Sequence, residues 1–240
     1  MIVDAHAHLD LGPNEVVSDM LDQGLVDITA ISSLIGGAFP TLDELRRAND
    51  HVFEWMRRYP GRVLGFAYAN PRLGEPGVTE LERCLSGGMR GVKLWISTLA
   101  DDPRVDPLMR VAERAGAVVL AHAWVKTTGN LPFESRPEHV RNLARRFPRV
   151  SFVLAHFGGE WETGAKAARD CDNLYVDTSG SLAEMDMVEY LVRQVGIERV
   201  LFGTDNMNLH YCLGKIAGAR LSDADRERIL WGNAAALFGL

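Results

Sequence analysis

The sequence predicts an α/β fold, a single (β/α)8 barrel domain that spans residues 1–240. Three observations support this fold: eight short apolar runs of the buried-strand type, amphipathic stretches between them, and no linker or change of composition along the chain. Strict alternation of strands and helices indicates a parallel sheet, and eight repeats suit a closed barrel. A doubly wound open sheet is the alternative, although that fold rarely contains eight such regular units.

The predicted strands are short and rich in Val, Ile, Leu and Ala, and they cover residues 2–8, 25–32, 62–69, 90–96, 117–123, 150–156, 174–179 and 199–205. A turn is expected over Asp10–Pro13, directly after the first strand. The helix over 14–23 is short. The helix within 41–60 has Thr41 as its N-cap and stops at Pro60, 136–148 follows the same pattern, and Ser222 caps the last helical stretch.

The composition excludes several classes of protein. A net charge of −6 and a pI near 5.7 argue against a surface that binds nucleic acid. No apolar run is long enough to cross a membrane and no signal-like leader precedes Ile2, so we expect a cytoplasmic protein. The three cysteines, Cys84, Cys171 and Cys212, form no CxxC pair and are expected to be reduced thiols.

Polar side chains stand where several predicted strands end. His6 and His8 project from one face of the first strand, because residues i and i+2 of a strand share a face. His122, His156 and Asp205 end the fifth, sixth and eighth strands. Each alone could be a hydrogen-bonded core residue or a helix cap. Together they would meet at one rim of a barrel, where buried polar groups are costly unless they are paired or bind a metal. Such ligands suit Zn²⁺, with Fe²⁺, Mn²⁺ or Ni²⁺ as alternatives.

The position of one lysine inside a predicted strand is also unusual. Only four of the 26 basic residues are lysines, and Lys93 lies inside the fourth predicted strand.

These motifs resemble the amidohydrolase superfamily, in particular its amidohydrolase-2 branch of metal-dependent TIM-barrel hydrolases and decarboxylases. The resemblance covers the whole chain, through "DAHAH", "GVKLW", "AH" on two strands, "LYVDTSG", "FGTD" and "ILWGNAAALFGL". It implies that His6, His8, His122 and Asp205 hold a first metal ion, and that His156 holds a second ion or acts on the substrate. It also implies that Lys93 could be a carboxylated lysine that bridges two ions, so the number of ions depends on it. Otherwise Lys93 binds a substrate carboxylate as an ammonium or points outward.

This ligand set predicts hydrolysis of an amide, lactone or ester in a small, carboxylated molecule. The metal would activate water and Asp205 would move its proton. The metal, with His156 if it is not itself a ligand, would polarise the carbonyl. A non-oxidative decarboxylase of an aromatic or unsaturated acid is the main alternative. The resemblance implies that such decarboxylases generally lack the strand-four lysine, so the presence of Lys93 favours hydrolysis. A TatD-like nuclease is a further alternative, but it carries a "GEIGLD"-like strand where this chain has "GVKLW". An inactive binding barrel is the last, and the intact ligand set argues against it.

The loops after the strands are expected to select the substrate. Three cationic residues could bind an anionic group of the substrate: Arg72, Lys126 and Arg136. Three tryptophans could form an apolar wall: Trp95, Trp124 and Trp161. His210 could overhang the site. Asp4 and Asp177 could orient a ligand histidine as carboxylates behind it. A homodimer is expected by default.

Overall fold

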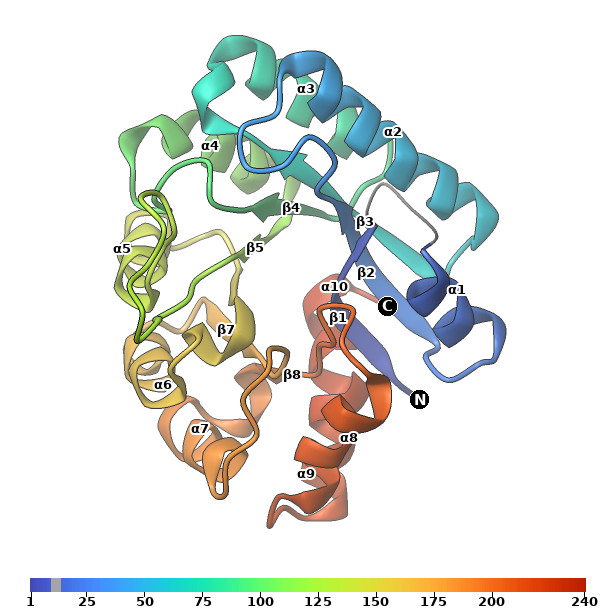
Figure 1. Ribbon diagram of the computed structural model, residues 1–240, viewed down its shortest axis with the longest axis vertical. Helices are drawn as coiled ribbons and strands as arrows, with labels where there is room; N and C mark the ends of the chain where they lie inside the picture. The colour runs from blue at the N-terminus through green and yellow to red at the C-terminus, as the bar shows by residue number, and fades with distance from the viewer. Residues whose placement is uncertain (10–13) are drawn as a thin grey trace.

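The computed structural model describes residues 1–9 and 14–240, and in these residues eight parallel strands form one sheet in the order β1 to β8 (Figure 1). The strands are β1 (Val3–Leu9), β2 (Ile28–Ser33), β3 (Val63–Ala69), β4 (Gly91–Leu94), β5 (Val118–Ala121), β6 (Phe152–Leu154), β7 (Leu174–Asp177) and β8 (Val200–Leu201). Each lies within a predicted strand or shifts from it by a residue, so the (β/α)8 barrel is confirmed. The turn predicted over Asp10–Pro13 lies outside the described residues.

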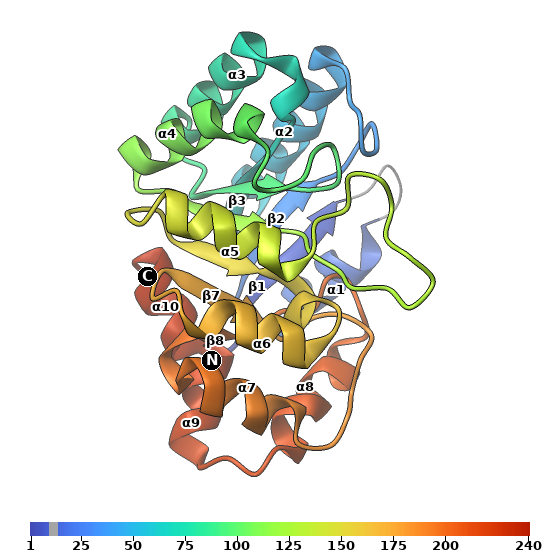
Figure 2. The ribbon, with the colours of Figure 1, turned by 90° about the vertical axis from the view of Figure 1, so that its left-hand side faces the viewer.

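Helices surround the strands as an outer layer (Figures 1 and 2). They are α1 (Glu15–Asp22), α2 (Leu42–Arg58), α3 (Glu75–Ser86), α4 (Asp106–Ala115), α5 (Pro137–Arg146), α6 (Trp161–Arg169), α7 (Met187–Val195), α8 (Leu209–Gly218), α9 (Asp223–Glu227) and α10 (Asn233–Phe238). Thr41 caps α2 through a capping box with Glu44, and the Ser222 hydroxyl accepts the Asp225 N–H at the start of α9. A π-helical turn over Arg228–Gly232 joins α9 to α10. No helix in the described part of the chain combines the length and apolar character needed to cross a bilayer.

Two apolar cores lie on opposite sides of the sheet. The larger packs the outward faces of the strands against the helices. The smaller fills the barrel interior with residues such as Leu64, Leu120 and Val153, and α10 adds Phe238, whose ring meets Phe66 edge-on at a centroid distance of 5.8 Å. The interior is therefore packed below the mouth, and the polar side chains lie above this packing at the carboxyl ends of the strands.

The barrel closes between its first and last strands without a regular strand ladder. The backbone N–H of Asp205 donates to the His6 carbonyl at 2.7 Å. The Asn206 side chain then acts as a strand partner, because its oxygen accepts the His8 N–H at 2.8 Å and its amide donates to the His8 carbonyl at 2.7 Å. This seam brings Asp205 beside the two histidines of β1.

Candidate metal centre and active site

Three side chains at the seam direct their donor atoms at one another. His6 Nε2 and His8 Nε2 lie 3.0 Å apart, and Asp205 Oδ1 lies 3.5 and 3.2 Å from them. Zinc–nitrogen and zinc–oxygen bonds are about 2.0–2.2 Å long, which places neighbouring ligand atoms roughly 3–3.5 Å apart. The donor spacing and chemistry of this group therefore fit a divalent metal ion.

The Nδ1 atoms of both rings, which face away from the cluster, each have a hydrogen-bond partner. His6 Nδ1–H donates to Asp177 Oδ2 at 2.9 Å, and His8 Nδ1 lies 2.8 Å from Ser32 Oγ. A carboxylate accepts but does not donate here, so His6 carries its proton on Nδ1 and keeps the Nε2 lone pair free. These partners preset both rings for a ligand role before any ion binds.

Asp4 does not share the face of the two histidines, contrary to the expectation from simple alternation. The pairing of β1 with β2 shifts by one residue between Asp4 and Ala7, so a β-bulge changes which face the later residues of β1 occupy. The Asp4 carboxylate instead accepts the backbone N–H groups of His6 and Thr204 and the Thr204 hydroxyl. Burial raises the pKa of Asp4 to about 6, although these hydrogen bonds lower it. Asp4 thus links the backbone of β1 to the segment after β8 and does not contact an imidazole ring.

Asp177 connects three strands. One oxygen receives the His6 ring, and the other accepts the backbone N–H groups of His156 at 3.0 Å and Ser179 at 2.9 Å as well as the Ser179 hydroxyl. Ser179 Oγ in turn lies 2.9 Å from His156 Nδ1. Asp177 therefore contacts the His6 ring and also accepts hydrogen bonds from backbone N–H groups.

Two of the candidate ligand residues adopt left-handed backbone conformations that non-glycine residues seldom occupy. The φ angle is 60° at His156 and 52° at Asp205, and each residue lies just beyond the end of its strand. Such conformations persist where the surrounding contacts enforce them, and they concentrate at functional sites. Here they turn both side chains toward the barrel mouth, since His156 Nδ1 lies 3.6 Å from Asp205 Oδ2.

His122 belongs to a second, adjoining cluster. Its Nδ1 lies 3.3 Å from His156 Nε2, and its Nε2–H donates to Glu134 Oε1 at 3.1 Å. Lys126 Nζ lies 2.8 Å from the same Glu134 oxygen. Among the described residues, two groups of His, Cys, Asp and Glu could hold a metal ion, namely His6–His8–Asp205 and His6–His156–Asp177, and His122 is in neither.

Lys93 points inward to the first cluster. Its Nζ lies 2.9 Å from His6 Nε2, and the residue is 1% exposed. Burial lowers the pKa of Lys93 to about 8, while the carboxylates of Asp205 and Asp177 act in the opposite direction. The outward orientation considered from the sequence is thus not the one observed.

The protonation states of the imidazoles and of Asp205 suit a bound cation. Burial lowers the pKa of His8 to about 3 and lowers those of His122 and His156, so these imidazoles are neutral near pH 7. Burial acts to raise the pKa of Asp205, but the surrounding histidines outweigh it and hold this pKa well below its usual range. Neutral imidazoles and an ionised carboxylate are the protonation states that metal binding requires.

Aromatic side chains surround the mouth. The ring of Trp124 lies 5.1 Å from that of His156 between centroids, and Trp95 meets Tyr68 at 6.3 Å. Gly159 permits the first contact, because at its φ of +79° a Cβ atom would come within 2.6 Å of the Val125 nitrogen and 2.7 Å of Trp124. The glycine at this position in "HFGGEW" therefore allows two loops to approach closely.

Arg72 is held between two rings that belong to other loops. Its guanidinium carbon lies 4.4 Å from the Phe133 centroid and 5.1 Å from that of Phe39, and its Nε–H donates to the Ser97 carbonyl. These partners come from the loops after β5, β2 and β4. Figure 2 shows the β5 loop, in yellow-green, projecting beyond the strands.

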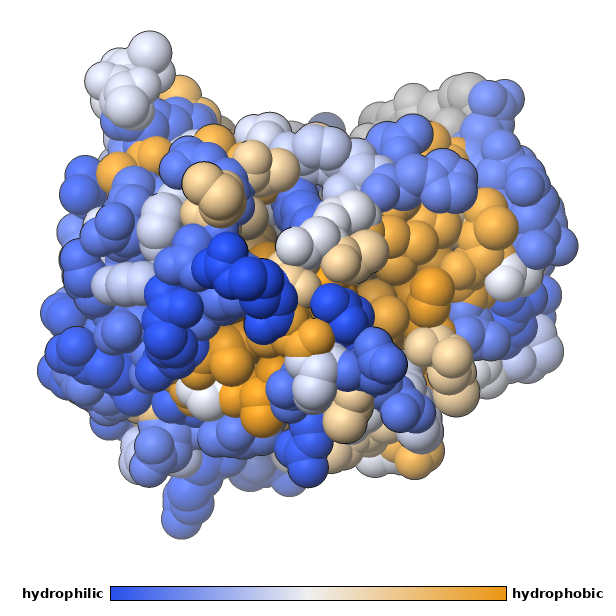
Figure 3. Space-filling view, turned by 90° about the horizontal axis from the view of Figure 1, so that it is seen from below, coloured by the Kyte–Doolittle hydropathy of each residue, from blue (hydrophilic) through white to orange (hydrophobic). Residues whose placement is uncertain are grey.

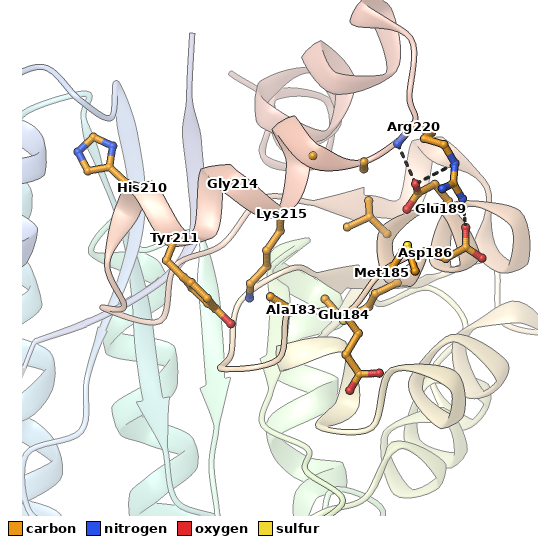
Figure 4. A pocket seen from close by; sticks show the side chains of 14 residues that line it. Ala183, Glu184, Met185, Asp186, Glu189, His210, Tyr211, Gly214, Lys215 and Arg220 are labelled. Carbon is orange, nitrogen blue, oxygen red and sulfur yellow. Dashed lines mark hydrogen bonds and ion pairs between the residues drawn. The ribbon is translucent and has the colours of Figure 1, made fainter.

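His210 belongs to α8, which follows the loop that carries Asp205. It is exposed in the first turn of α8 and lines a cavity of about 460 Å³ between α7 and α8, together with Tyr211, Lys215 and Arg220 (Figure 4). Figure 3 views the face that carries α7, α8 and α9, where apolar side chains gather in separate areas between polar ones. The expectation that His210 overhangs the site stays a prediction.

Several site residues escaped the sequence analysis: Ser32, Glu134, Ser179 and Asn206. Each of them contacts residues that are distant in sequence, and no local sequence pattern predicts such contacts. Asn206 gives the nearest signal, because it directly follows Asp205 in "FGTDN".

Curated relatives of this chain are decarboxylases. The 2-amino-3-carboxymuconate-6-semialdehyde decarboxylase of Dictyostelium discoideum is 24% identical over 83% of this chain and 67% of its own length. The gamma-resorcylate decarboxylase of a Polaromonas species is 26% identical over 81% of this chain and 76% of its own length. The prediction of a C–N or C–O hydrolase is therefore wrong, since these relatives are lyases, and the decarboxylase alternative fits them better.

Solved structures support the fold. A dihydroxybenzoic acid decarboxylase from Polaromonas, with bound manganese and the inhibitor 2-nitroresorcinol, has a TM-score of 0.78 at 18% identity, and the match covers 100% of this chain and 97% of that one. The amidohydrolase family model matches residues 3–240, and the chain belongs to the amidohydrolase family.

Proposed function

We propose that this protein is a metal-dependent, non-oxidative decarboxylase of a small aromatic or unsaturated acid. The observation that carries the proposal is the cluster of His6, His8 and Asp205, whose donor atoms lie 3.0–3.5 Å apart beside an aromatic wall. The curated relatives named above support the reaction class.

The three side chains would hold the ion. When bound, it supplies a Lewis acid that binds the substrate carboxylate and draws negative charge from it. Zinc was favoured from the ligand types, whereas a decarboxylase of the same fold binds manganese, so both ions belong in the first assays.

The reaction balances without a redox partner. The bond between the substrate carbon and its carboxylate breaks, CO2 leaves, and the electron pair stays on the carbon, which takes one proton. Water supplies that proton, and Asp205 and His156 are the groups placed to relay it, because both face the cluster and the Asp205 side chain is 27% exposed.

Trp124 and Trp95 would form the wall against which an unsaturated substrate packs. Arg72 suits a second anionic or polar group of the substrate, because no ion pair engages it among the described residues and two rings already hold it in place. Lys126 is a weaker candidate, since Glu134 neutralises its charge.

The test is a decarboxylation assay on the purified protein loaded with Mn²⁺ or Zn²⁺. Aromatic acids such as 2,6-dihydroxybenzoate would be screened by CO2 release and by the change in ultraviolet absorbance. Activity that disappears with a chelator, returns with added ion, and falls at least 100-fold in Asp205→Asn and His156→Asn supports the proposal. Metal-loaded protein that releases no CO2 from any acid in a broad panel contradicts it.

Metal content decides the number of ions. The proposal is one ion per chain, because Lys93 contributes an amine near His6. Two equivalents in the wild type that fall to one in Lys93→Met would instead support the carboxylated, bridging lysine.

A further inference from the structure

Glu134 is a buried carboxylate that the proposed reaction does not use. It lies in the loop after β5, twelve residues beyond His122, and its side chain is 3% exposed. Ionised carboxylates are costly to bury unless each oxygen has partners. The partners of Glu134 therefore indicate why it is there.

Each oxygen of Glu134 has a distinct partner set. Oε1 accepts the His122 Nε2–H at 3.1 Å and lies 2.8 Å from Lys126 Nζ. Oε2 accepts the Leu131 N–H at 3.0 Å, which closes a turn of the same loop. One carboxylate thus ties the loop, a cation and a site histidine together.

The contact with His122 has a chemical consequence. A carboxylate beside a ring nitrogen favours the tautomer that carries a proton on that nitrogen, so His122 would be protonated at Nε2. The other nitrogen, Nδ1, then presents a lone pair, and it lies 3.3 Å from His156 Nε2. The ring of Trp124 lies nearly parallel to that of His122, at an interplanar angle of 17° and a centroid distance of 6.5 Å.

We propose that Glu134 is a positioning residue that fixes the His122 tautomer, with Nε2 protonated and the Nδ1 lone pair open toward His156. An open lone pair can accept a proton from His156 or bind a cation, whereas a protonated Nδ1 could do neither. The inference adds a residue to the proposed active site, but it concerns the protein without metal and does not depend on the reaction.

The experiment is nitrogen-15 NMR of metal-free protein labelled at histidine, with the His122 signals assigned by their loss in His122→Asn. In the wild type we expect one tautomer, protonated at Nε2. In Glu134→Gln the neutral amide can donate as well as accept, so we expect a mixture of both tautomers. Glu138→Gln is the matched control, because Glu138 lies in α5 and pairs with Arg136, and it should leave the His122 signals unchanged.

Lys126→Met separates the carboxylate from the loop. It removes the other partner of Glu134 Oε1 and leaves the carboxylate beside His122, so the single tautomer should persist. Release of His122 in this variant, as in Glu134→Gln, would show that loop packing holds the ring and would overturn the inference. A wild-type His122 protonated at Nδ1 would overturn it without any variant, even if Glu134→Gln fails to fold.

Titrations of the same wild-type protein with Mn²⁺ and, separately, with Zn²⁺ distinguish this inference from the proposed function. A single Nε2 tautomer in a protein that binds neither ion would support the role of Glu134 and contradict the metal-dependent reaction. A mixture of tautomers in a protein that binds either ion would contradict the role of Glu134 and leave the metal-dependent reaction supported.

Discussion

Asp177→Asn tests whether the groups behind the ligands set the site. The carboxylate receives the His6 ring on one oxygen and the N–H groups of His156 and Ser179 on the other. Asparagine keeps one oxygen, which would stay with the two N–H groups. Its NH2 would then face the proton on His6 Nδ1, and two donors cannot pair.

The magnitude follows from these contacts. A buried hydrogen bond to a charged group contributes about 1.5–3 kcal/mol, so unfolding should become about 2–3 kcal/mol easier. For a chain of this size that corresponds to a fall in Tm of roughly 4–12 °C. If His6 instead moves its proton to Nε2, it loses the lone pair that faces His8, and Mn²⁺ affinity should fall about 10- to 100-fold.

The assay is urea unfolding of the metal-free proteins, followed by Mn²⁺ titration, with the exposed Asp172→Asn as control. The pH dependence has a defined sign. Burial acts to raise the pKa of Asp177, but His6 and Ser179 hold it well below its usual range. Its stabilisation should therefore be fully present above about pH 4 and be lost as the pH falls further. A variant within about 0.5 kcal/mol and twofold in Mn²⁺ affinity of the wild type would refute the reasoning.

Three further predictions concern other parts of the fold. Glu80→Gln should lower the free energy of unfolding by about 1–3 kcal/mol at pH 7, because buried Glu80 accepts two hydrogen bonds from Arg83 at 2.8 Å. Hydrogen bonds from Arg83 outweigh burial and lower the pKa of Glu80, so urea unfolding should show a smaller loss below about pH 4. Gly159→Ala should cost at least about 2 kcal/mol and change tryptophan fluorescence, whereas Gly24→Ala, at a φ of +66° with open space around it, should cost only about 1 kcal/mol by the same unfolding assay. Burial raises the pKa of the Cys212 thiol to about 11, so a thiol reagent at pH 8 should label it only after unfolding; rapid labelling of the native protein would contradict its burial.

The fold was readable from the sequence because its main signal is local. Short apolar runs and capped amphipathic helices depend on residues near one another, and Thr41 and Ser222 cap helices as their sequence contexts predict. The position of the histidine pair and Asp205 also followed, since parallel strands end at a common rim.

The remaining features depend on tertiary structure. A one-residue bulge in β1 reverses the face of Asp4, and nothing in "IVDAHAHLD" marks it. Glu134 reaches His122 only through the folded β5 loop. The prediction of hydrolysis is wrong for a different reason: the same donor atoms serve hydrolysis and decarboxylation, and the presence of Lys93 does not decide between them.

The seam between β1 and β8 also bears on how the protein is made. His6 and His8 are synthesised first, yet Asn206, which holds the backbone of His8, follows 198 residues later. A nascent chain, or one cut before this segment, would carry the imidazole pair without its carboxylate. Contacts that span so much sequence form late, because the intervening chain must first be ordered. Metal capture by the cluster would therefore report that the seam between β1 and β8 has formed and the barrel has closed.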